Sequence, residues 1–156
     1  MSEDRGAIRS EEAYALGKML DHSDWQRGEK IARLITPSDV DACFDNNGNV
    51  IFCEFSSQHD DWSRISLGQR LLYQNCINGT DHLAVLCRHS VKASDGRRIN
   101  SRTDIQSFQV MLHDRILLYS PVIDGNDKWQ KLIQWWFEDA VMARRVFIGK
   151  AALHNL

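Results

Sequence analysis

The dipeptide Asn47-Gly48 constrains the fold of this chain more than any other feature of its sequence. A type I′ turn needs positive φ at both central positions, and Asn followed by Gly is the pair that most often supplies them. We therefore predict a β-hairpin within residues 35–56, ITPSDVDACFDNNGNVIFCEFS, with Asn47 and Gly48 as its two-residue loop. Counting outward from this loop places Asp41 directly opposite Glu54.

The opposed acids of this hairpin are the first candidate functional feature. Directly opposed residues have Cβ atoms about 4.5–5.5 Å apart, and like charges placed so destabilise the sheet. A divalent cation would compensate, since Mg²⁺ is commonly held by one or two carboxylates together with waters and phosphate oxygens. Asp39 lies two residues before Asp41 and shares its face, so three carboxylates can gather there. The alternatives are a solvated acidic edge strand without metal, or a one-residue slip that separates the acids.

Size and composition describe an ordinary globular protein. The 156 residues correspond to one domain, and the net charge of −2 leaves any nucleic-acid contact to a local basic patch. No apolar run reaches the length of about 18 residues that indicates a membrane span, and the polar, acidic first residues argue against a signal peptide. The cysteines lack C-x-x-C spacing, which predicts reduced core thiols in a cytoplasmic protein and disfavours a zinc site; they are Cys43, Cys53, Cys76 and Cys87.

Helices are predicted on both sides of the hairpin. Ser10 and the capping box at Ser23 indicate two helices within residues 10–35. A further helix is expected over residues 65–78, closed by Gly79, with a buried face formed by Leu71, Leu72 and Cys76. The last predicted helix covers residues 126–143. Its apolar residues repeat at intervals of three and four, which indicates a core-facing stripe: Trp129, Leu132, Ile133, Trp136, Phe137, Ala140 and Val141.

Further strands are predicted after the middle helix. The run HLAVLC over residues 82–87 is apolar throughout, which is typical of a strand covered on both faces. Strands are also expected at 107–112 and 115–120, with a turn at His113-Asp114 between them. The core would therefore occupy residues 36–120.

Two loops carry charged residues. The segment SQHDDWS contains His59, Asp60 and Asp61, for which a solvated connection is favoured over a metal site because their spacing suits no particular geometry. Residues 88–103 read as a long basic loop, and such a cluster is typical of phosphate contacts, although a solvated surface loop is the alternative. Its candidate nucleic-acid-binding residues are Lys92, Arg97, Arg98 and Arg102, next to Arg88.

The hairpin acids and the following helix resemble the PD-(D/E)XK nuclease superfamily. The phrase Gln69-Arg-Leu-Leu-Tyr73 is similar to the Q-x-x-x-Y motif of its RecB and lambda-exonuclease branch, and GQRLL looks like small phage and prophage members. The resemblance covers roughly residues 37–87. It implies an α/β, restriction-endonuclease-like fold with an α-β-β-β-α-β core, in which a central mixed sheet is flanked by helices. It also implies a cytoplasmic protein of a bacterium or phage-infected cell.

The resemblance implies a metal-dependent deoxyribonuclease. Asp41, Glu54 and the backbone carbonyl of Phe55 would hold Mg²⁺ or Mn²⁺, with Asp39 as an additional ligand. Gln69 and Tyr73 would line the site. The family's lysine is replaced by Ser56, which shares a strand face with Glu54 but whose hydroxyl supplies no positive charge.

That replacement leaves the function open between two classes. The first is an active nuclease acting on DNA. The second is a catalytically impaired binding protein with a nuclease fold, for example a phage inhibitor of a host defence enzyme. A third alternative is a small α/β domain without metal. The tail after residue 143 is basic and then apolar, which would suit either a DNA contact or a homodimer interface.

Overall fold

The computed structural model describes residues 40–154. They lie within one compact unit and form an α/β fold with a six-stranded mixed sheet. The predicted helices of residues 10–35, and Asp39 with them, fall outside the described residues. The single-domain prediction for the whole chain therefore stays a prediction.

The hairpin forms as the turn chemistry predicts. Strand β1 (Ala42–Asn46) pairs antiparallel with β2 (Asn49–Ser56) in the expected register, from Asn46 opposite Asn49 to Ala42 opposite Cys53. Asn47 and Gly48 both have positive φ, 52° and 88°, as a type I′ turn requires. The Asp45 side chain accepts a hydrogen bond from the Gly48 N–H at 2.8 Å, which adds a further local constraint on the turn.

The middle helix and its flanking strands form a β-α-β unit. Helix α3 (Leu67–Ile77) begins after Ser66, whose hydroxyl accepts from the Gln69 N–H, and the chain leaves it through Gly79 with φ 68°. Strand β3 (Leu83–His89) then pairs parallel with β2, so the carboxyl ends of β2 and β3 lie at the same edge of the sheet. Arg88 therefore belongs to a strand, whereas the sequence placed it in a loop.

The second half of the sheet is antiparallel. Strand β4 (Ile105–Asp114) pairs with β3 and with β5 (Ile116–Tyr119), and the short β6 (Ile123–Asp124) pairs with the beginning of β4. The predicted turn at His113-Asp114 was wrong by one to two residues, since both lie in β4. The reversal occurs at Arg115, which has a φ of 63°.

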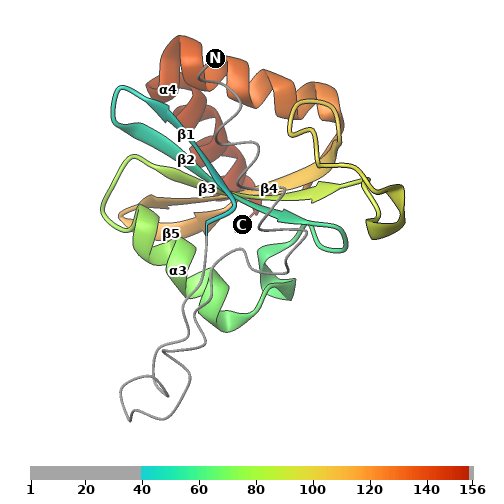
Figure 1. Ribbon diagram of the computed structural model, residues 1–156. Helices are drawn as coiled ribbons and strands as arrows, with labels where there is room; N and C mark the ends of the chain where they lie inside the picture. The colour runs from blue at the N-terminus through green and yellow to red at the C-terminus, as the bar shows by residue number, and fades with distance from the viewer. Residues whose placement is uncertain (1–39, 155–156) are drawn as a thin grey trace. The chain divides into compact units, whose positions relative to one another are not determined.

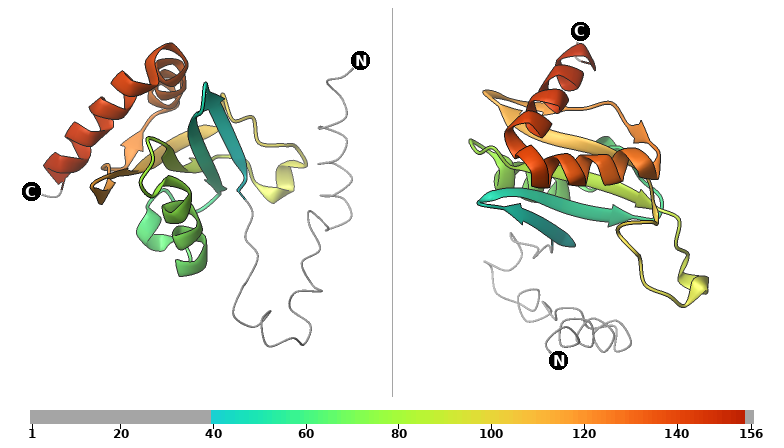
Figure 2. Two further views of the ribbon diagram at one scale, coloured as in Figure 1. Left: turned by 90° about the vertical axis from the view of Figure 1, so that its left-hand side faces the viewer. Right: turned by 90° about the horizontal axis from the view of Figure 1, so that it is seen from above.

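Helices α3 and α4 cover opposite faces of the sheet (Figures 1 and 2). On the α4 face, the buried aromatics Trp129, Trp136 and Phe147 pack over Ile51, Val85 and Val110, among other strand residues. On the α3 face, Tyr73 and Ile77 pack with Trp62, Ala84, Leu86 and Met111. Trp62 belongs to a 3₁₀ turn, Trp62–Arg64, in the connection between β2 and α3.

Helix α4 (Asn126–His154) extends well beyond the predicted end at residue 143. Its backbone leaves the helical region at Asp139, where φ is −156° and ψ is 91°. The Asp139 carboxylate accepts from the Met142 N–H at 3.0 Å, which is the contact of an N-cap residue at the start of a second helical segment. Phe137 and Val141, on either side of the break, are both exposed although the stripe predicted them in the core. Leu71 of α3 is likewise exposed rather than buried, because the inner face of α3 runs along Tyr73 and Ile77.

No helix within residues 40–154 has the length and apolarity that a membrane crossing requires. The cysteines of this part of the chain are all free thiols. Cys53 and Cys87 are buried, as expected of core thiols, whereas Cys43 is exposed.

Candidate functional site

The centre of the candidate site is the buried carboxylate of Glu54. The side chain lies on the α3 face of β2 and is only 8% exposed. Its Oε1 accepts from Gln69 Nε2 at 3.0 Å, and its Oε2 contacts the Tyr73 hydroxyl at 2.7 Å. Gln69 and Tyr73 are four residues apart on α3, so one helix face supplies both partners. The structure thus brings together three of the predicted site residues.

The Tyr73 hydroxyl has a single proton to donate and two acceptors within reach, and the backbone of Asp41 also forms a hydrogen bond to it. The second acceptor is the backbone carbonyl of Cys53, at 2.9 Å. When Glu54 is ionised, Tyr73 can donate to its carboxylate, and when Glu54 is protonated, Glu54 can donate to the Tyr73 oxygen and leave Tyr73 to donate to Cys53. The direction of the Glu54–Tyr73 hydrogen bond therefore depends on the protonation of Glu54.

The pKa of Glu54 is set mainly by its burial. Burial raises it from 4.5 to about 7, while the Tyr73 hydrogen bond opposes the shift and the charge of Asp41 adds to it. The pKa of Tyr73 is raised far above its usual value by burial and by its contact with Glu54. A carboxyl group poised near neutrality in this way is typical of functional sites.

Asp41 lies at the solvent side of the same site. The ladder between β1 and β2 ends at Ala42, and the exposed Asp41 side chain then reaches across to β2. Its Oδ2 accepts from the Phe55 N–H at 2.7 Å, which replaces the backbone hydrogen bond that β1 no longer supplies. The negative charge of Asp41 is close enough to Glu54 to raise its pKa. The predicted pair of acids is therefore brought together.

The donors at this site fit a hard divalent cation. Two carboxylates are available, and Mg²⁺ is commonly bound by one or two carboxylates with waters and phosphate oxygens. Each oxygen of Glu54 keeps a lone pair beyond its present hydrogen bond, so Gln69 and Tyr73 do not block a further ligand. Within residues 40–154 no group of three or more His, Cys, Asp or Glu side chains is arranged to hold a metal. The roles of Asp39 and of the Phe55 carbonyl as additional ligands remain predictions.

Ser56, at the position of the family's lysine, is used locally. Its hydroxyl oxygen accepts from the backbone N–H groups of Gln58 and His59 at 3.2 and 3.0 Å, which tightens the turn after β2. The hydroxyl thus acts as a structural acceptor in the connecting loop and brings no positive charge.

A cation nevertheless lies beside Ser56. Arg88 is its partner in the parallel register of β2 and β3, so both side chains project from the α3 face of the sheet, as Glu54 does. The Arg88 Nε atom lies 3.1 Å from Ser107 Oγ and 3.4 Å from Asp60 Oδ2, and Ser107 donates to Asp60 at 2.7 Å. The Arg88 side chain is 38% exposed, so this group is oriented but still open to solvent.

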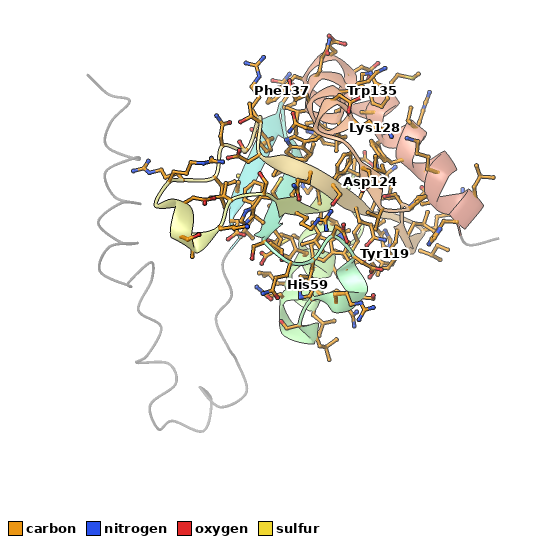
Figure 3. All side chains as sticks on the ribbon, turned by 90° about the vertical axis from the view of Figure 1, so that its right-hand side faces the viewer. His59, Tyr119, Asp124, Lys128, Trp135 and Phe137 are labelled. Atoms are coloured by element: carbon orange, nitrogen blue, oxygen red, sulfur yellow. The ribbon has the colours of Figure 1, made fainter. Side chains whose placement is uncertain are left out.

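The loop between β2 and α3 is held by hydrogen bonds and an ion pair. These contacts favour a connecting loop over a metal site. Asp60 pairs with Arg88, and Asp61 caps the 3₁₀ turn by accepting from the Ser63 N–H at 2.8 Å. The backbone N–H of Trp62 donates to Gln109 Oε1, and its indole N–H donates to the Gln109 carbonyl. His59 lies on the α3 side of the sheet, away from Phe137 and Trp135 of α4 (Figure 3).

The basic side chains of the loop after β3 differ in their surroundings, although they form one cluster in the sequence. The Arg97 guanidinium is held by both carboxylate oxygens of Asp104 at 2.7 and 3.1 Å, and this contact lowers the pKa of Asp104. Asp104 also accepts from the Asn100 N–H, so Arg97 closes the loop rather than projecting freely. Lys92 and Arg102 are exposed. Nucleic-acid contacts by these residues and Arg98 remain a prediction.

The sequence did not indicate that Arg88, Asp60 and Ser107 contact one another beside Ser56. Arg88 directly follows the apolar run 82–87, which was predicted as a strand, so its place at a strand end could have been inferred. The pairing of β3 with β2 was needed to place it beside Ser56. Ser107 enters from β4 and carries no recognisable local signal.

Comparisons of the chain with protein-family models, with curated proteins and with solved structures found no match.

Proposed function

We propose that this protein is a metal-dependent nuclease that hydrolyses phosphodiester bonds of DNA. The observation that carries the proposal is the pair formed by buried Glu54 and exposed Asp41. Burying a carboxylate costs folding free energy unless a partner compensates, and here the pKa stays raised despite two hydrogen-bond partners. A cation bound between the two acids would remove that cost.

The order of the elements supports a restriction-endonuclease-like fold. An acid-bearing hairpin, a helix that contacts the acid, and a strand parallel to the hairpin follow one another as in the α-β-β-β-α-β core. In that arrangement β1 and β2 would be the second and third strands of the core, and β3 the fourth. Within residues 40–154, two of the three strands that precede the helix in that core are present.

Each side chain has a definite task in the proposed reaction. Asp41 and Glu54 would hold Mg²⁺ or Mn²⁺, which as a Lewis acid polarises the scissile phosphate and lowers the pKa of a bound water. Gln69 and Tyr73 orient the Glu54 carboxylate, so that its oxygens face the ligand in one fixed geometry. Glu54 must release its proton to solvent before it can act as an anionic ligand, which predicts lower activity at acid pH.

Arg88 is our candidate for the positive charge that Ser56 does not provide. It lies beside Ser56 on the same face of the sheet as Glu54, and its contacts with Ser107 and Asp60 hold its side chain in a defined orientation. Preorganised cations stabilise charge that develops in the transition state of phosphoryl transfer. Arg88→Gln should therefore lower kcat, whereas Arg115→Gln at the far β4–β5 turn should leave it unchanged.

The alternative is a nuclease-fold binding protein without catalysis, in which a protein or nucleic-acid partner contacts the site. The observation in its favour is the Ser56 hydroxyl, which serves the turn after β2. The two functions differ in whether phosphodiester bonds are cleaved.

The test is incubation of the purified protein with supercoiled DNA, linear DNA and RNA in the presence of Mg²⁺ or Mn²⁺. The matched variants are Asp41→Asn, Glu54→Gln and, as a control on an exposed acid away from the site, Asp114→Asn. Thermal stability is measured in parallel, because a ligand that binds only the native state raises the melting temperature.

We expect DNA cleavage and metal-dependent stabilisation by the parent and by Asp114→Asn, and neither by the two site variants. Cleavage that persists in Glu54→Gln would overturn the assignment of the site. Metal-dependent stabilisation without cleavage of any substrate would favour the binding protein. A folded protein with neither response would exclude the metal site.

A further inference from the structure

A polar cavity lies at the edge of the sheet where the parallel strands β2 and β3 end. Its volume is about 430 Å³, within the range of about 300–1,000 Å³ typical of ligand pockets. It is lined by residues from three segments that are distant in sequence: Ser57 after β2, His89 to Lys92 at the end of β3, and Gln106 of β4. The loop that contains the 3₁₀ turn Ala93–Asp95 extends from this edge (Figure 2).

The lining of this cavity favours an anion. Ser57, Ser90, Lys92 and Gln106 all offer hydrogen-bond donors, and no carboxylate lies among the lining residues. The Nδ1 atom of His89 is buried and has no hydrogen-bond partner within residues 40–154. Buried polar atoms normally have partners, so this nitrogen is an unsatisfied polar atom of a residue in the cavity wall.

The nearby acids do not cancel this preference. Burial lowers the pKa of His89, while a hydrogen bond with the Val91 backbone and the charges of Asp104 and Asp41 act in the opposite direction. Asp104 is already neutralised by Arg97 at 2.7 Å. Asp41 is exposed to solvent, which weakens the effect of its charge on the cavity.

The cavity lies at the same edge of the sheet as the candidate active site. Ser57 directly follows Ser56, and the alternation of side chains along a strand places it on the face opposite Ser56 and Glu54. The charge of Asp41 influences both Glu54 and His89, so this acid is within electrostatic range of both places. A chain of linked phosphates crossing the ends of β2 and β3 would therefore meet both the carboxylate pair and the cavity.

We propose that this cavity binds a phosphate group of the polynucleotide strand, adjacent to the phosphate that is cleaved at Glu54 and Asp41. The inference rests on the proposed nuclease function, which supplies the strand, but it assigns a separate binding site with separate residues. Lys92 provides the charge, and His89, Ser57 and Ser90 provide directed hydrogen bonds. Such backbone contacts position a strand without reading its sequence.

The experiment measures the dissociation constant of a short, fluorescently labelled single-stranded DNA in EDTA, so that the metal site contributes nothing. Lys92→Gln is compared with Lys128→Gln, which makes the same change at an exposed position on α4 (Figure 3). A charge-assisted contact is worth about a tenfold change in affinity. We expect Lys92→Gln to weaken binding by about tenfold and to reduce the slope of log K against log salt by about 0.7.

His89 supplies a readout that does not depend on charge alone. In the wild-type protein, the imidazole NMR signals of His89 should shift on titration with inorganic phosphate and with the oligonucleotide, and the His89→Gln variant should bind the oligonucleotide more weakly. Equal affinities for Lys92→Gln and Lys128→Gln, or His89 signals that stay unmoved, would overturn the proposal.

This outcome is separable from that of the proposed function. DNA binding in EDTA that depends on Lys92 and His89, in a protein that cleaves nothing, would support the phosphate site and reject the nuclease. Cleavage that depends on Glu54, with unaltered KM in Lys92→Gln, would support the nuclease and reject the phosphate site.

Discussion

At the scale of single residues, Glu54 links the stability of the protein to its proposed chemistry. Its carboxyl group is buried on the α3 face, where burial raises the pKa to about 7. The native state thus binds a proton that the unfolded chain has already released between pH 4.5 and 7. An excess of protons bound by the native state means that stability falls as pH rises. The same residue can therefore be examined without any assumption about the substrate.

The first prediction concerns the pH dependence of the metal-free protein. Its free energy of unfolding should be highest below pH 4.5 as far as Glu54 is concerned, should decline through pH 7, and should level off above that. A shift of this size corresponds to roughly 2 kcal/mol after allowance for solvent near the site. Urea unfolding in EDTA at several pH values should show this slope in the parent and in Asp114→Asn but not in Glu54→Gln. An identical slope in Glu54→Gln would contradict it.

The second prediction concerns the Tyr73 hydroxyl, which contacts both Glu54 and the Cys53 carbonyl. Tyr73→Phe should reduce the free energy of unfolding by about 1–3 kcal/mol, because two buried groups lose their partner. It should also raise the pKa of Glu54 further, since the Tyr73 hydrogen bond favours the ionised carboxylate. Metal-dependent stabilisation should weaken as a result.

Tyr119→Phe is the matched control for this variant. Tyr119 is partly exposed, and its hydroxyl accepts from Gln74 Nε2 at 2.9 Å. Its loss should cost less and leave the pH dependence unchanged. Equal effects of the two substitutions at every pH would show that Tyr73 has no special relation to Glu54.

At the scale of elements, the predictions that depended on a few neighbouring residues were correct, and the one that depended on a long pattern was not. The hairpin register and the helix end at Gly79 were predicted correctly because Asn47-Gly48 and Gly79 dictate backbone conformation within two or three residues. The end of α4 was predicted wrongly because an apolar stripe assumes one continuous helix. The break at Asp139 interrupts that stripe. Phe137, just before the break, is exposed, while Trp136 is buried.

The third prediction tests that break. Asp139→Ala removes the acceptor of the Met142 N–H and should lower the free energy of unfolding by about 0.5–2 kcal/mol, the usual cost of losing an N-cap. Asp139→Asn keeps a side-chain oxygen in the same place and should cost much less. Chemical denaturation of both variants measures the difference. If Asn and Ala were equally destabilising, the capping role would be wrong.

At the scale of the whole molecule, the site depends on the order of the strands. Arg88 stands beside Ser56 only because β3 pairs with β2, and Ser107 and Gln109 reach the same face only because β4 pairs with β3. These pairings join residues far apart in the sequence, so no local pattern indicates them. The acids and the Gln69/Tyr73 pair were accessible from sequence because a hairpin and a single helix face contain them.

The same long-range packing explains why α4 continues past residue 143. Its second segment places Ala143, Phe147 and Ala151 in the core on the α4 face, and all three are at most 2% exposed. Val146, next to Phe147, is 37% exposed and faces outward. The buried residues are four positions apart, but two of them are alanines and only Phe147 is large. Such a pattern is a weak apolar signal in the sequence. Phe147 is therefore expected to supply most of the apolar burial of this segment.

The fourth prediction follows from that burial. Phe147→Ala should lower the free energy of unfolding by about 3–5 kcal/mol, because it removes a fully buried aromatic and leaves a cavity among side chains that relax only in part. Val146→Ala should change it by less than about 1 kcal/mol, since this side chain is already partly in water. Equilibrium urea denaturation compares the two. If both substitutions had the same small effect, the segment after Asp139 would not be part of the core. The packed part of α4 would then be as short as its apolar stripe predicts.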